Sequence, residues 1–567
     1  MFEPIPTKAV AMPLAMFASL RRLGVVFALA CLTLVAWPGS AWAQATLSRD
    51  QARELRLYGA ALILARPGAG PALRRAGAAK LTTALPIWRL RSGAAVRVLP
   101  GLMRDGLVSE VEPDQPVELA NHLGQGDPLI PQEWWISSVG LDRAEPPGPG
   151  KPVTVIDTGV DLTHEEFATR PATRALNPQS TTALSEEHGT AVASVVGAPA
   201  NGLGLVGVYP QATLQAWDAS PDGTGITVGD VVLGLDAAIK NGPGVINLSL
   251  GSPVQNPLLD AMVAVTVSSG SLVVAAAGNS RTGGSPLEYP ASLPHVLTVG
   301  AIDQTGRPAF FSSGSPYVDL AAPGMSIPVA VPTTYNPPPS HYDTFSGTSF
   351  ASPIVAGASA WVWTVRPTLD AGQLAGVMRA SAQDISDPGF DPFSGFGRLD
   401  IPAALTVAPP ARDPQEPNED VSYVKPAGFL HRALTPLTAA GRSRGAIVGR
   451  LEFAEDPRDV YRFWVPAKRT AVVALKPSGG DVDLGLWGPR TISVLETGAA
   501  RKRDFRGVSE RPGTRREALR VKNTSRRGAY YYAEASVGAS SGNVVRRVTG
   551  LGYRISVSII RTKHARR

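Results

Sequence analysis

A run of small residues behind one serine constrains the fold of this chain more than any other feature. Ser349 follows the turn-forming pair Gly347 and Thr348, and residues 351–360 are almost all small or apolar. Such a run predicts a helix that is packed on every side. The serine hydroxyl would lie at the helix N-terminus, where unpaired amides and the helix dipole stabilise negative charge. A serine in that position can act as a nucleophile if a base and an acid reach it from elsewhere.

Two earlier segments supply the candidates for these partners. Asp157 ends the apolar run 153–156, which predicts a buried strand, and open α/β sheets place their sites at the carboxyl ends of strands. His188 precedes valines that recur at helical spacing over 192–196, so we expect the imidazole at the start of a buried helix. The order Asp, His, Ser is one of three known orders of a serine-nucleophile triad.

These segments and three others resemble the subtilisin-like serine peptidases over residues 127–410. The triad motifs are Asp157-Thr-Gly159, His188-Gly-Thr190 and Gly347-Thr-Ser349-Phe-Ala-Ser-Pro353. Between the last two lie Val245-Ile-Asn-Leu-Ser-Leu-Gly251, Val274-Ala-Ala-Ala-Gly-Asn279 and Tyr289-Pro-Ala-Ser292. One such motif would be weak evidence for this resemblance, whereas six motifs in the same order are specific evidence. The resemblance implies a three-layer α/β/α catalytic domain around a parallel sheet.

The resemblance also implies a role for each of these residues. Ser349 would attack the peptide carbonyl, His188 would accept its proton, and Asp157 would orient the imidazole. Asn279 and the Ser349 backbone N–H would stabilise the oxyanion. No cofactor is expected for this chemistry. Two strand ends are expected to bind substrate through Ser249, Leu250, Gly251, Ala276, Ala277 and Gly278. None of those six is acidic, so we expect tolerance for large apolar side chains.

Other enzyme classes fit the sequence less well. An aspartic peptidase needs two aspartates, but there is one Asp-Thr-Gly. An α/β-hydrolase needs a Gly-x-Ser-x-Gly elbow with the serine first in the triad order, whereas here the serine comes last and lies in a Gly-Thr-Ser motif. A zinc peptidase needs His-Glu-x-x-His, which this sequence lacks. Two alternatives stay open: a catalytically silent binding relative, and a transpeptidase in which an amine replaces water at the acyl-enzyme. Ala191 departs from the family pattern, in which many members have a second histidine there.

A structural calcium ion is a further implication of the resemblance. In the family, the loop after the histidine helix carries a calcium ligand, and residues 200–207 match that loop. Asn201 and Glu166 would offer the hard oxygen ligands that calcium prefers. A plain Asn-Gly turn is the alternative at this position.

Residues 1–43 are typical of a secretory signal peptide. Arg21 and Arg22 precede the apolar run 23–36, and Ala41-Trp-Ala43 is a small-residue cleavage site. The alternatives are an uncleaved anchor and a lipoprotein cleaved before Cys31, the only cysteine. We therefore expect a secreted protein, or one in the periplasm or cell envelope, without a disulfide after cleavage.

Residues 44–126 are expected to form a small α+β propeptide that inhibits the enzyme until it is removed. The sequence predicts strands at 61–64, 94–99 and 107–111, and residues 108–114 are similar to the end of the family's inhibitory prodomains. A parallel sheet forms slowly, so a folding template is useful. A permanent N-terminal domain is the alternative.

The pattern changes after the catalytic part. A proline-rich linker at 409–418 precedes short alternating segments at 459–465, 470–475, 481–487, 529–533 and 553–559. These predict a C-terminal β-sandwich over 411–567. Residues 501–567 carry 18 Lys and Arg but 4 Asp and Glu, which suits contact with an anionic surface, although a solvated basic face is the alternative. No nucleic-acid motif accompanies the charge, so no nucleic-acid partner is expected.

Overall fold

The computed structural model of the protein describes residues 47, 49–82, 85–114, 126–168, 170, 172–181, 187–335, 340–426, 428, 430, 434–538 and 550–561. These residues belong to two compact units, Met1–Ala120 and Asn121–Arg567. The predicted signal peptide and its cleavage site after Ala43 lie outside the described residues. Of the helices in the described part of the chain, none has the length and apolarity needed to cross a membrane.

The first unit contains a four-stranded antiparallel sheet with the order β2-β3-β1-β4. Its elements are α1 (Arg49–Tyr58), β1 (Ala60–Ala65), α2 (Gly70–Arg75), β2 (Ala79–Lys80), β3 (Ile87–Arg91), α3 (Ser92–Arg104) and β4 (Val108–Pro113). The prediction of a strand at 94–99 is wrong, because these residues lie in α3. Ala95, Leu99 and Leu102 recur at intervals of four and three residues and are buried, which is the spacing of one helix face.

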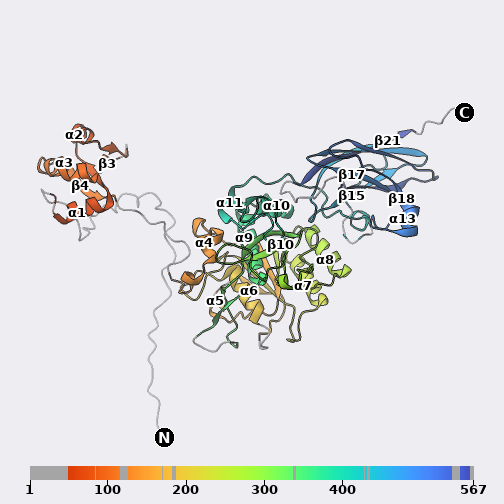
Figure 1. The fold of residues 1–567 in the computed structure, drawn as a ribbon, viewed down its shortest axis with the longest axis horizontal. Helices are drawn as coiled ribbons and strands as arrows, with labels where there is room; N and C mark the ends of the chain where they lie inside the picture. The colour runs from red at the N-terminus through yellow and green to blue at the C-terminus, as the bar shows by residue number, and fades with distance from the viewer. Residues whose placement is uncertain are drawn as a thin grey trace, which may run out of the picture. The chain divides into compact units, whose positions relative to one another are not determined.

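A seven-stranded sheet forms the centre of the second unit (Figure 1). Its order is β11-β10-β9-β8-β5-β7-β6, and every neighbouring pair is parallel. The strands are β5 (Pro152–Asp157), β6 (Thr173–Ala175), β7 (Thr213–Asp218), β8 (Val245–Leu248), β9 (Leu272–Ala276), β10 (Val296–Ile302) and β11 (Val318–Pro323). Every residue of β8 and β9 is buried, as expected for strands covered on both faces.

Helices cover both faces of this sheet, which confirms the predicted three-layer α/β/α fold. On one face lie α6 (Glu187–Gly197) and α9 (Thr348–Val365), in one cluster with Val274 of β9. On the other face lie α7 (Val228–Lys240) and α8 (Pro257–Ser268), in one cluster with Val273. Adjacent residues of a strand point to opposite faces, so β9 contributes to both layers.

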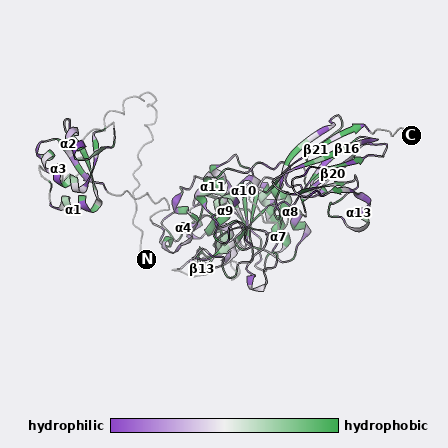
Figure 2. Ribbon diagram, turned by 45° about the horizontal axis from the view of Figure 1, so that its top comes forward, coloured by the Kyte–Doolittle hydropathy of each residue, from purple (hydrophilic) through white to green (hydrophobic). Residues whose placement is uncertain are grey.

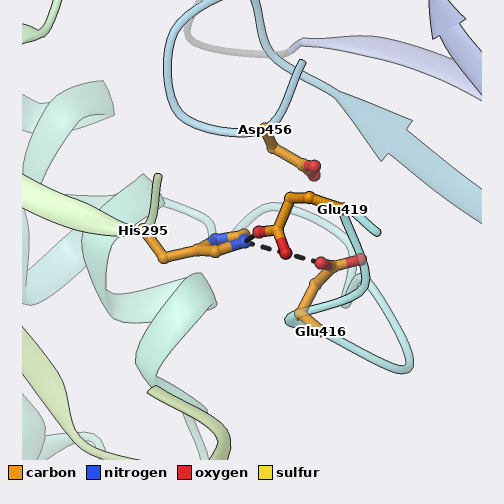
Figure 3. Close-up of side chains that lie close together, drawn as sticks. All are labelled: His295, Glu416, Glu419 and Asp456. Atoms are coloured by element: carbon orange, nitrogen blue, oxygen red, sulfur yellow. Dashed lines mark hydrogen bonds and ion pairs between the residues drawn. The ribbon is translucent and has the colours of Figure 1, made fainter. Parts of the chain in front are cut away.

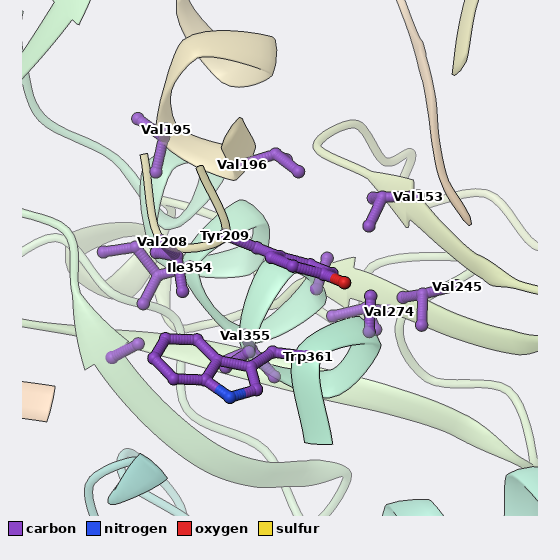
Figure 4. Close-up of a cluster of buried hydrophobic side chains, with 14 of the residues drawn as sticks. Val153, Val195, Val196, Val208, Tyr209, Val245, Val274, Ile354, Val355 and Trp361 are labelled. Carbon is purple, nitrogen blue, oxygen red and sulfur yellow. The ribbon is translucent and has the colours of Figure 1, made fainter. Parts of the chain in front are cut away.

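Helix α9 is buried along most of its length, as its small residues predicted. The Trp361 and Tyr209 rings pack with centroids 6.4 Å apart, among the valines and isoleucine of this layer (Figure 4). A Cβ added at Gly357 would lie 3.0 Å from the Val196 carbonyl oxygen, so only a glycine allows this approach of α6 to α9 without a shift. This packing fixes the N-terminus of α9, and with it the backbone of Ser349.

The sheet is supplemented by shorter elements. They are η1 (Ile130–Gln132), α4 (Trp135–Val139), η2 (Leu141–Arg143), α5 (Glu165–Ala168), η3 (Arg281–Gly283), β12 (Ile327–Ala330), β13 (Tyr342–Phe345), α10 (Ala371–Ser381) and α11 (Ile401–Thr406). Helix α10 begins with a capping box, in which the Asp370 carboxylate accepts from the Gln373 N–H and the Gln373 side chain accepts from the Asp370 N–H.

Two four-stranded antiparallel sheets follow, which confirms the predicted C-terminal β-sandwich. Their orders are β14-β21-β16-β19 and β15-β20-β17-β18. The elements are α12 (Val421–Val424), β14 (Arg444–Leu451), β15 (Arg458–Val465), β16 (Arg469–Ser478), β17 (Val482–Trp487), α13 (Gly498–Asp504), β18 (Phe505–Ser509), β19 (Glu517–Lys522), β20 (Ala529–Val537) and β21 (Leu551–Arg561). Apolar residues of both sheets form one core, and hydrophobic residues are prominent along β16 and β21 (Figure 2).

Candidate active site

Asp157 and His188 meet at the carboxyl end of the parallel sheet. Asp157 is the last residue of β5 and is buried, and His188 is the second residue of α6. The imidazole Nδ1 lies 2.6 Å from Asp157 Oδ1, which also accepts from the Thr158 N–H at 2.8 Å. Burial lowers the pKa of His188, but the charge of Asp157 and the hydrogen bond to it outweigh burial and hold that pKa above its ordinary value.

Ser349 lies in the first turn of α9, and a hydrogen-bonded chain fixes its backbone. The Asn247 side chain donates to Ser249 Oγ (2.9 Å), which donates to the Ser349 carbonyl (2.8 Å). Ser352 Oγ in turn donates to Asn247 Oδ1 (2.8 Å). Phe350, the next residue, packs its ring 5.8 Å from the His188 ring. The structure therefore brings the serine to the neighbourhood of the histidine.

The Ser349 side chain points to a different acceptor. Its Oγ donates to the Ser249 carbonyl at 3.3 Å, and no hydrogen bond between His188 and Ser349 is present among the described residues. Catalytic hydrogen bonds are often long or misaligned until substrate binds. A rotation about the Cα–Cβ bond of Ser349 would be the smallest change able to redirect the hydroxyl.

Asn279 is held in one orientation by Thr348. The Thr348 N–H and hydroxyl both donate to Asn279 Oδ1, at 2.9 and 3.0 Å. The same hydroxyl accepts from the Gly278 N–H at 3.2 Å. With Oδ1 engaged twice, the Asn279 Nδ2 amide remains as a donor next to the N-terminus of α9. Thr348 is a positioning residue that the sequence did not reveal, because its hydroxyl acts through contacts with residues 69 and 70 positions away.

The two predicted substrate-binding segments begin at the ends of neighbouring strands. Ser249, Leu250 and Gly251 follow β8, whereas Ala276 ends β9 and is followed by Ala277 and Gly278. Strands β8 and β9 are parallel neighbours, so their carboxyl ends lie at the same edge of the sheet. Beyond them, Ser252 and Tyr289 exchange two backbone hydrogen bonds, which places residues 288–289 beside the first segment.

Glu166 and Asn201, the predicted calcium ligands, are in contact. The Asn201 Nδ2 donates to Glu166 Oε2 at 3.4 Å, and Glu166 Oε1 accepts from the Leu205 N–H at 3.0 Å. Sequence reasoning missed Asp127, whose Oδ1 accepts from the three backbone amides of residues 201–203. Its Oδ2 is buried and has no hydrogen-bond partner in the described part of the chain. This donor set suits a hard cation.

Burial raises the pKa of both buried glutamates near this loop. The pKa of Glu166 rises to about 7, and the charge of Asp127 contributes to the rise. The pKa of Glu133, which accepts from the Val206 N–H, rises to about 8 for the same kind of reason. Carboxyl groups that repel one another in a buried loop favour either protons or a bound cation.

Comparisons with known proteins agree on one family. A family model described as the subtilase family matches residues 148–397. Subtilisin DY of Bacillus licheniformis is 36% identical over 254 residues, which are 44% of this chain and 89% of that protein. Subtilisin BL of Lederbergia lenta is 36% identical over 255 residues, 43% of this chain and 91% of that protein. A solved psychrophilic subtilisin-like protease from Pseudoalteromonas sp. AS-11 is 19% identical, with a TM-score of 0.42 over 48% of this chain and 96% of its own.

Proposed function

Because the chain belongs to the subtilase family of serine peptidases, we propose that it hydrolyses peptide bonds in proteins through Asp157, His188 and Ser349. The observation that carries the proposal is the 2.6 Å contact of His188 Nδ1 with a buried carboxylate, beside a serine at a helix N-terminus. This contact fixes the tautomer of the imidazole: Nδ1 carries the proton, so Nε2 is left with the lone pair that can accept one.

The reaction then follows from the residues present. Ser349 Oγ forms a bond to the peptide carbonyl carbon as its proton passes to His188 Nε2, and Asp157 stabilises the imidazolium. His188 returns that proton to the nitrogen of the leaving amine, and the C–N bond breaks. Water, deprotonated by the same histidine, then forms a bond to the acyl carbon; the bond from that carbon to Ser349 Oγ breaks, and His188 returns the proton to Oγ. The Asn279 amide and the Ser349 N–H face the negative charge that develops on oxygen.

Product analysis distinguishes hydrolysis from the two alternatives. Casein digested in ¹⁸O-labelled water should yield peptides whose new carboxyl ends carry the label, because water attacks the acyl-enzyme. Unlabelled products that join two fragments would instead identify a transpeptidase. Intact casein after incubation with the processed wild-type protein would identify a silent binding relative. Only the first result agrees with the proposed function.

Replacement of Asn279 by alanine is expected to lower kcat by about 10²–10³, with little change in KM. This magnitude is the one known for subtilisin itself and is carried over to this chain. Thr348→Val should cause a smaller loss, because the Asn279 amide remains but loses one of its two anchors. Steady-state kinetics of both variants and of their combination test this. If Thr348 acts through Asn279, the double variant is no slower than Asn279→Ala, whereas additive losses would contradict the coupling.

The rate is expected to fall on the acid side with a midpoint above 6.5, the ordinary pKa of histidine. His188 must be neutral to accept the serine proton, and Asp157 raises its pKa, so protonation begins at a higher pH than for a free imidazole. A pH profile of kcat/KM on a peptide without ionisable side chains measures this limb. A midpoint below the ordinary value would mean that the pair does not govern the free enzyme.

The finer features of the proposal concern maturation and location. We infer that residues 1–43 direct export and that residues 44–126 inhibit the enzyme as a propeptide. Intact mass of the exported protein tests both: a form beginning near residue 127 is expected for the wild type. If the Ser349→Ala variant keeps the propeptide, the enzyme removes it itself. The basic C-terminal region would favour retention on anionic surfaces.

Calcium is proposed at the loop of residues 200–207. Asp127 and Glu166 would supply carboxylate oxygens, and Asn201 would supply its amide oxygen after releasing the Leu203 N–H. A bound ion would stabilise this loop and take no part in the bond-breaking steps.

A further inference from the structure

A second group of carboxylates lies where the linker meets the catalytic sheet and the β-sandwich. Oxygens of four residues approach within 4.8 Å of one another: Asp413, Glu416, Asp456 and Asp459. Asp413 and Glu416 belong to the linker after α11, Asp456 lies in the turn before β15, and Asp459 is in β15. A second, overlapping set shares Glu416 and Asp456 and adds Glu419 and His295, from the loop before β10 (Figure 3).

Two of these side chains are buried with an oxygen that lacks a partner. Asp456 is 7% exposed and Asp459 is 0% exposed. The Oδ1 atoms of both have no hydrogen-bond partner among the residues that the structure describes. The other oxygen of Asp459 accepts from the Tyr553 hydroxyl, and the carboxyl group also lies within hydrogen-bonding reach of the Glu416 carboxyl group. Asp456 Oδ1 has neither kind of contact within the described part of the chain. Buried carboxylates are costly unless a cation or hydrogen bonds compensate them.

The side-chain cations nearby do not balance this charge. Imidazole Nε2 of His295 contacts Glu419 and lies 3.5 Å from Glu416 Oε2. The Arg450 guanidinium is attracted by Asp413 and Asp456. Arg379, on the same cavity, is already paired with Asp319 and Glu455, at 3.2 and 3.3 Å. Five carboxylates, counting Glu419, therefore face one imidazole and one guanidinium within the described residues.

We propose that Asp413, Glu416, Asp456 and Asp459 bind a calcium ion that fastens the linker to the β-sandwich. All four ligands are hard oxygens, which calcium prefers over transition metals. Calcium–oxygen distances are about 2.3–2.6 Å, so ligands on opposite sides of one ion lie about 5 Å apart, which matches the observed group. A cavity of about 260 Å³, lined by three of the four ligands, offers space for entry and for water ligands.

The site would also secure the sandwich to the catalytic domain. Glu419, three residues after Glu416, contacts His295, and the His295 N–H donates to the Glu455 carbonyl at 3.2 Å. The ligand Asp456 follows Glu455 directly. An ion held between Glu416 and Asp456 thus lies between two contacts that join the domains. Its loss is expected to loosen the sandwich and to leave the chemistry at Ser349 intact.

Calcium titration of the full chain tests this site. The parent carries Ser349→Ala, to prevent self-digestion, and Glu166→Gln, to remove the loop site. After chelator treatment, calorimetry with calcium chloride should give one equivalent of bound ion, and calcium should raise the melting temperature. Adding Asp456→Asn should abolish both effects. Adding Glu510→Gln, which removes an exposed charge from the same sandwich, should change neither.

Three results would overturn the proposal. The first is that the Asp456→Asn variant still binds one equivalent of calcium, and the second is that the parent binds none. The third is a parent that binds zinc but not calcium, which would point to His295 as a ligand. If Asp456→Asn does not fold, Asp413→Asn replaces it, because Asp413 lies in the linker outside the sandwich core. If the Asp413→Asn variant still binds one equivalent of calcium, that result also contradicts the proposal.

A separate inference concerns which substrates the enzyme selects. It rests on the proposed function and on the position of Glu288. Its side chain lies between the two segments expected to bind substrate: a Cβ added at Gly278 would lie 2.7 Å from Glu288 Cγ, and one at Gly251 would lie 3.3 Å from Oε2. Glycine at both positions leaves the space that the glutamate takes. The half-buried carboxylate has no hydrogen bond or ion pair with any described residue, and burial raises its pKa.

We infer that Glu288 selects substrates with lysine or arginine before the scissile bond. An unpaired carboxylate beside the substrate backbone gains a charge-assisted hydrogen bond from such a side chain. The expectation of a large apolar residue rested only on the six residues of the two segments. Glu288 escaped it because the glutamate follows them in sequence by ten positions or more and reaches them only through the fold.

Paired peptides that differ only in lysine or methionine at that position test the selection. The wild type should favour lysine in kcat/KM by about ten- to hundredfold, and Glu288→Gln should abolish the preference while still cleaving the methionine peptide. Glu145→Gln, an exposed charge elsewhere, is the control and should keep it. An unchanged lysine-to-methionine ratio in Glu288→Gln would overturn the inference and leave the peptidase assignment intact. No cleavage of either peptide by the wild type would refute both.

Discussion

Replacement of Ser349 by alanine is expected to lower kcat by about 10⁶, an effect known from subtilisin itself and carried over to this chain. The physical reason is that the Oγ of this serine forms the bond to the substrate carbonyl, so without it no acyl-enzyme can form. The fold should persist, because the Ser349 backbone carbonyl still accepts from Ser249 Oγ. Initial rates on a chromogenic peptide, with residual activity checked for contamination, measure the loss.

Ser359→Ala is the matched control for this loss. Ser359 lies in the same helix, is fully buried, and its Oγ has no hydrogen-bond partner among the described residues. The same atom is removed from α9 without touching the site, so the rate should stay within about twofold. An equal loss in both variants would show that damage to α9, and not the missing nucleophile, stops the reaction.

Asp157→Asn is expected to lower kcat by about 10⁴ at neutral pH, the size of loss seen when a triad aspartate becomes an amide. Asp157 Oδ1 accepts from both His188 Nδ1 and the Thr158 N–H. An asparagine that kept its oxygen in the Oδ1 position would still accept from both donors but would carry no negative charge to stabilise the imidazolium. An asparagine in the opposite orientation would turn its NH₂ group toward His188. Nδ1 would then have to accept, Nε2 would carry the proton, and the histidine could not act as a base.

Asp161→Asn separates this effect from a general loss of stability. Asp161 is also buried, and its two oxygens accept from residues Thr163 and Thr333. Its substitution should lower the melting temperature, because Thr163 and Thr333 each donate twice to it, but should leave kcat largely unchanged. If both aspartate variants lose activity in proportion to their melting temperatures, Asp157 has a structural role only.

The fold was predictable where one periodicity dominates. The buried parallel strand β5 is a short apolar run, and α9 is a run of small residues, so local sequence was enough for both. The segment 94–99 was wrongly predicted as a strand, because alanine and valine fit a strand as well as a helix over so short a stretch. The spacing of Ala95, Leu99 and Leu102, which extends beyond that segment, indicates the helix α3. Strands β14, β18 and β19 were missed because their apolar residues do not mark the buried face: Val448 and Val508 are exposed, whereas Glu517 is buried.

The site was predictable to the extent that motifs encode it. Asp157 lies at the end of a strand, Asn279 lies shortly after one, and His188 lies at the start of a helix. The residues beside each of them in the sequence form a recognisable motif. Thr348 and Glu288 act through contacts between distant segments. Asp127 lay next to the expected start of the mature chain, where nothing in the sequence indicated that residues 201–203 would donate to its carboxylate.

The most direct test of the triad is to identify the residue that a serine-directed reagent labels. The native protein, freed of its propeptide, is treated with phenylmethanesulfonyl fluoride, digested and mapped by mass spectrometry. The label should be found on Ser349 in the wild type, in step with loss of activity, and should be absent from His188→Ala and from denatured protein. A label on another serine that tracks the loss of activity, or full activity after Ser349 is modified, would contradict the assignment of Asp157, His188 and Ser349.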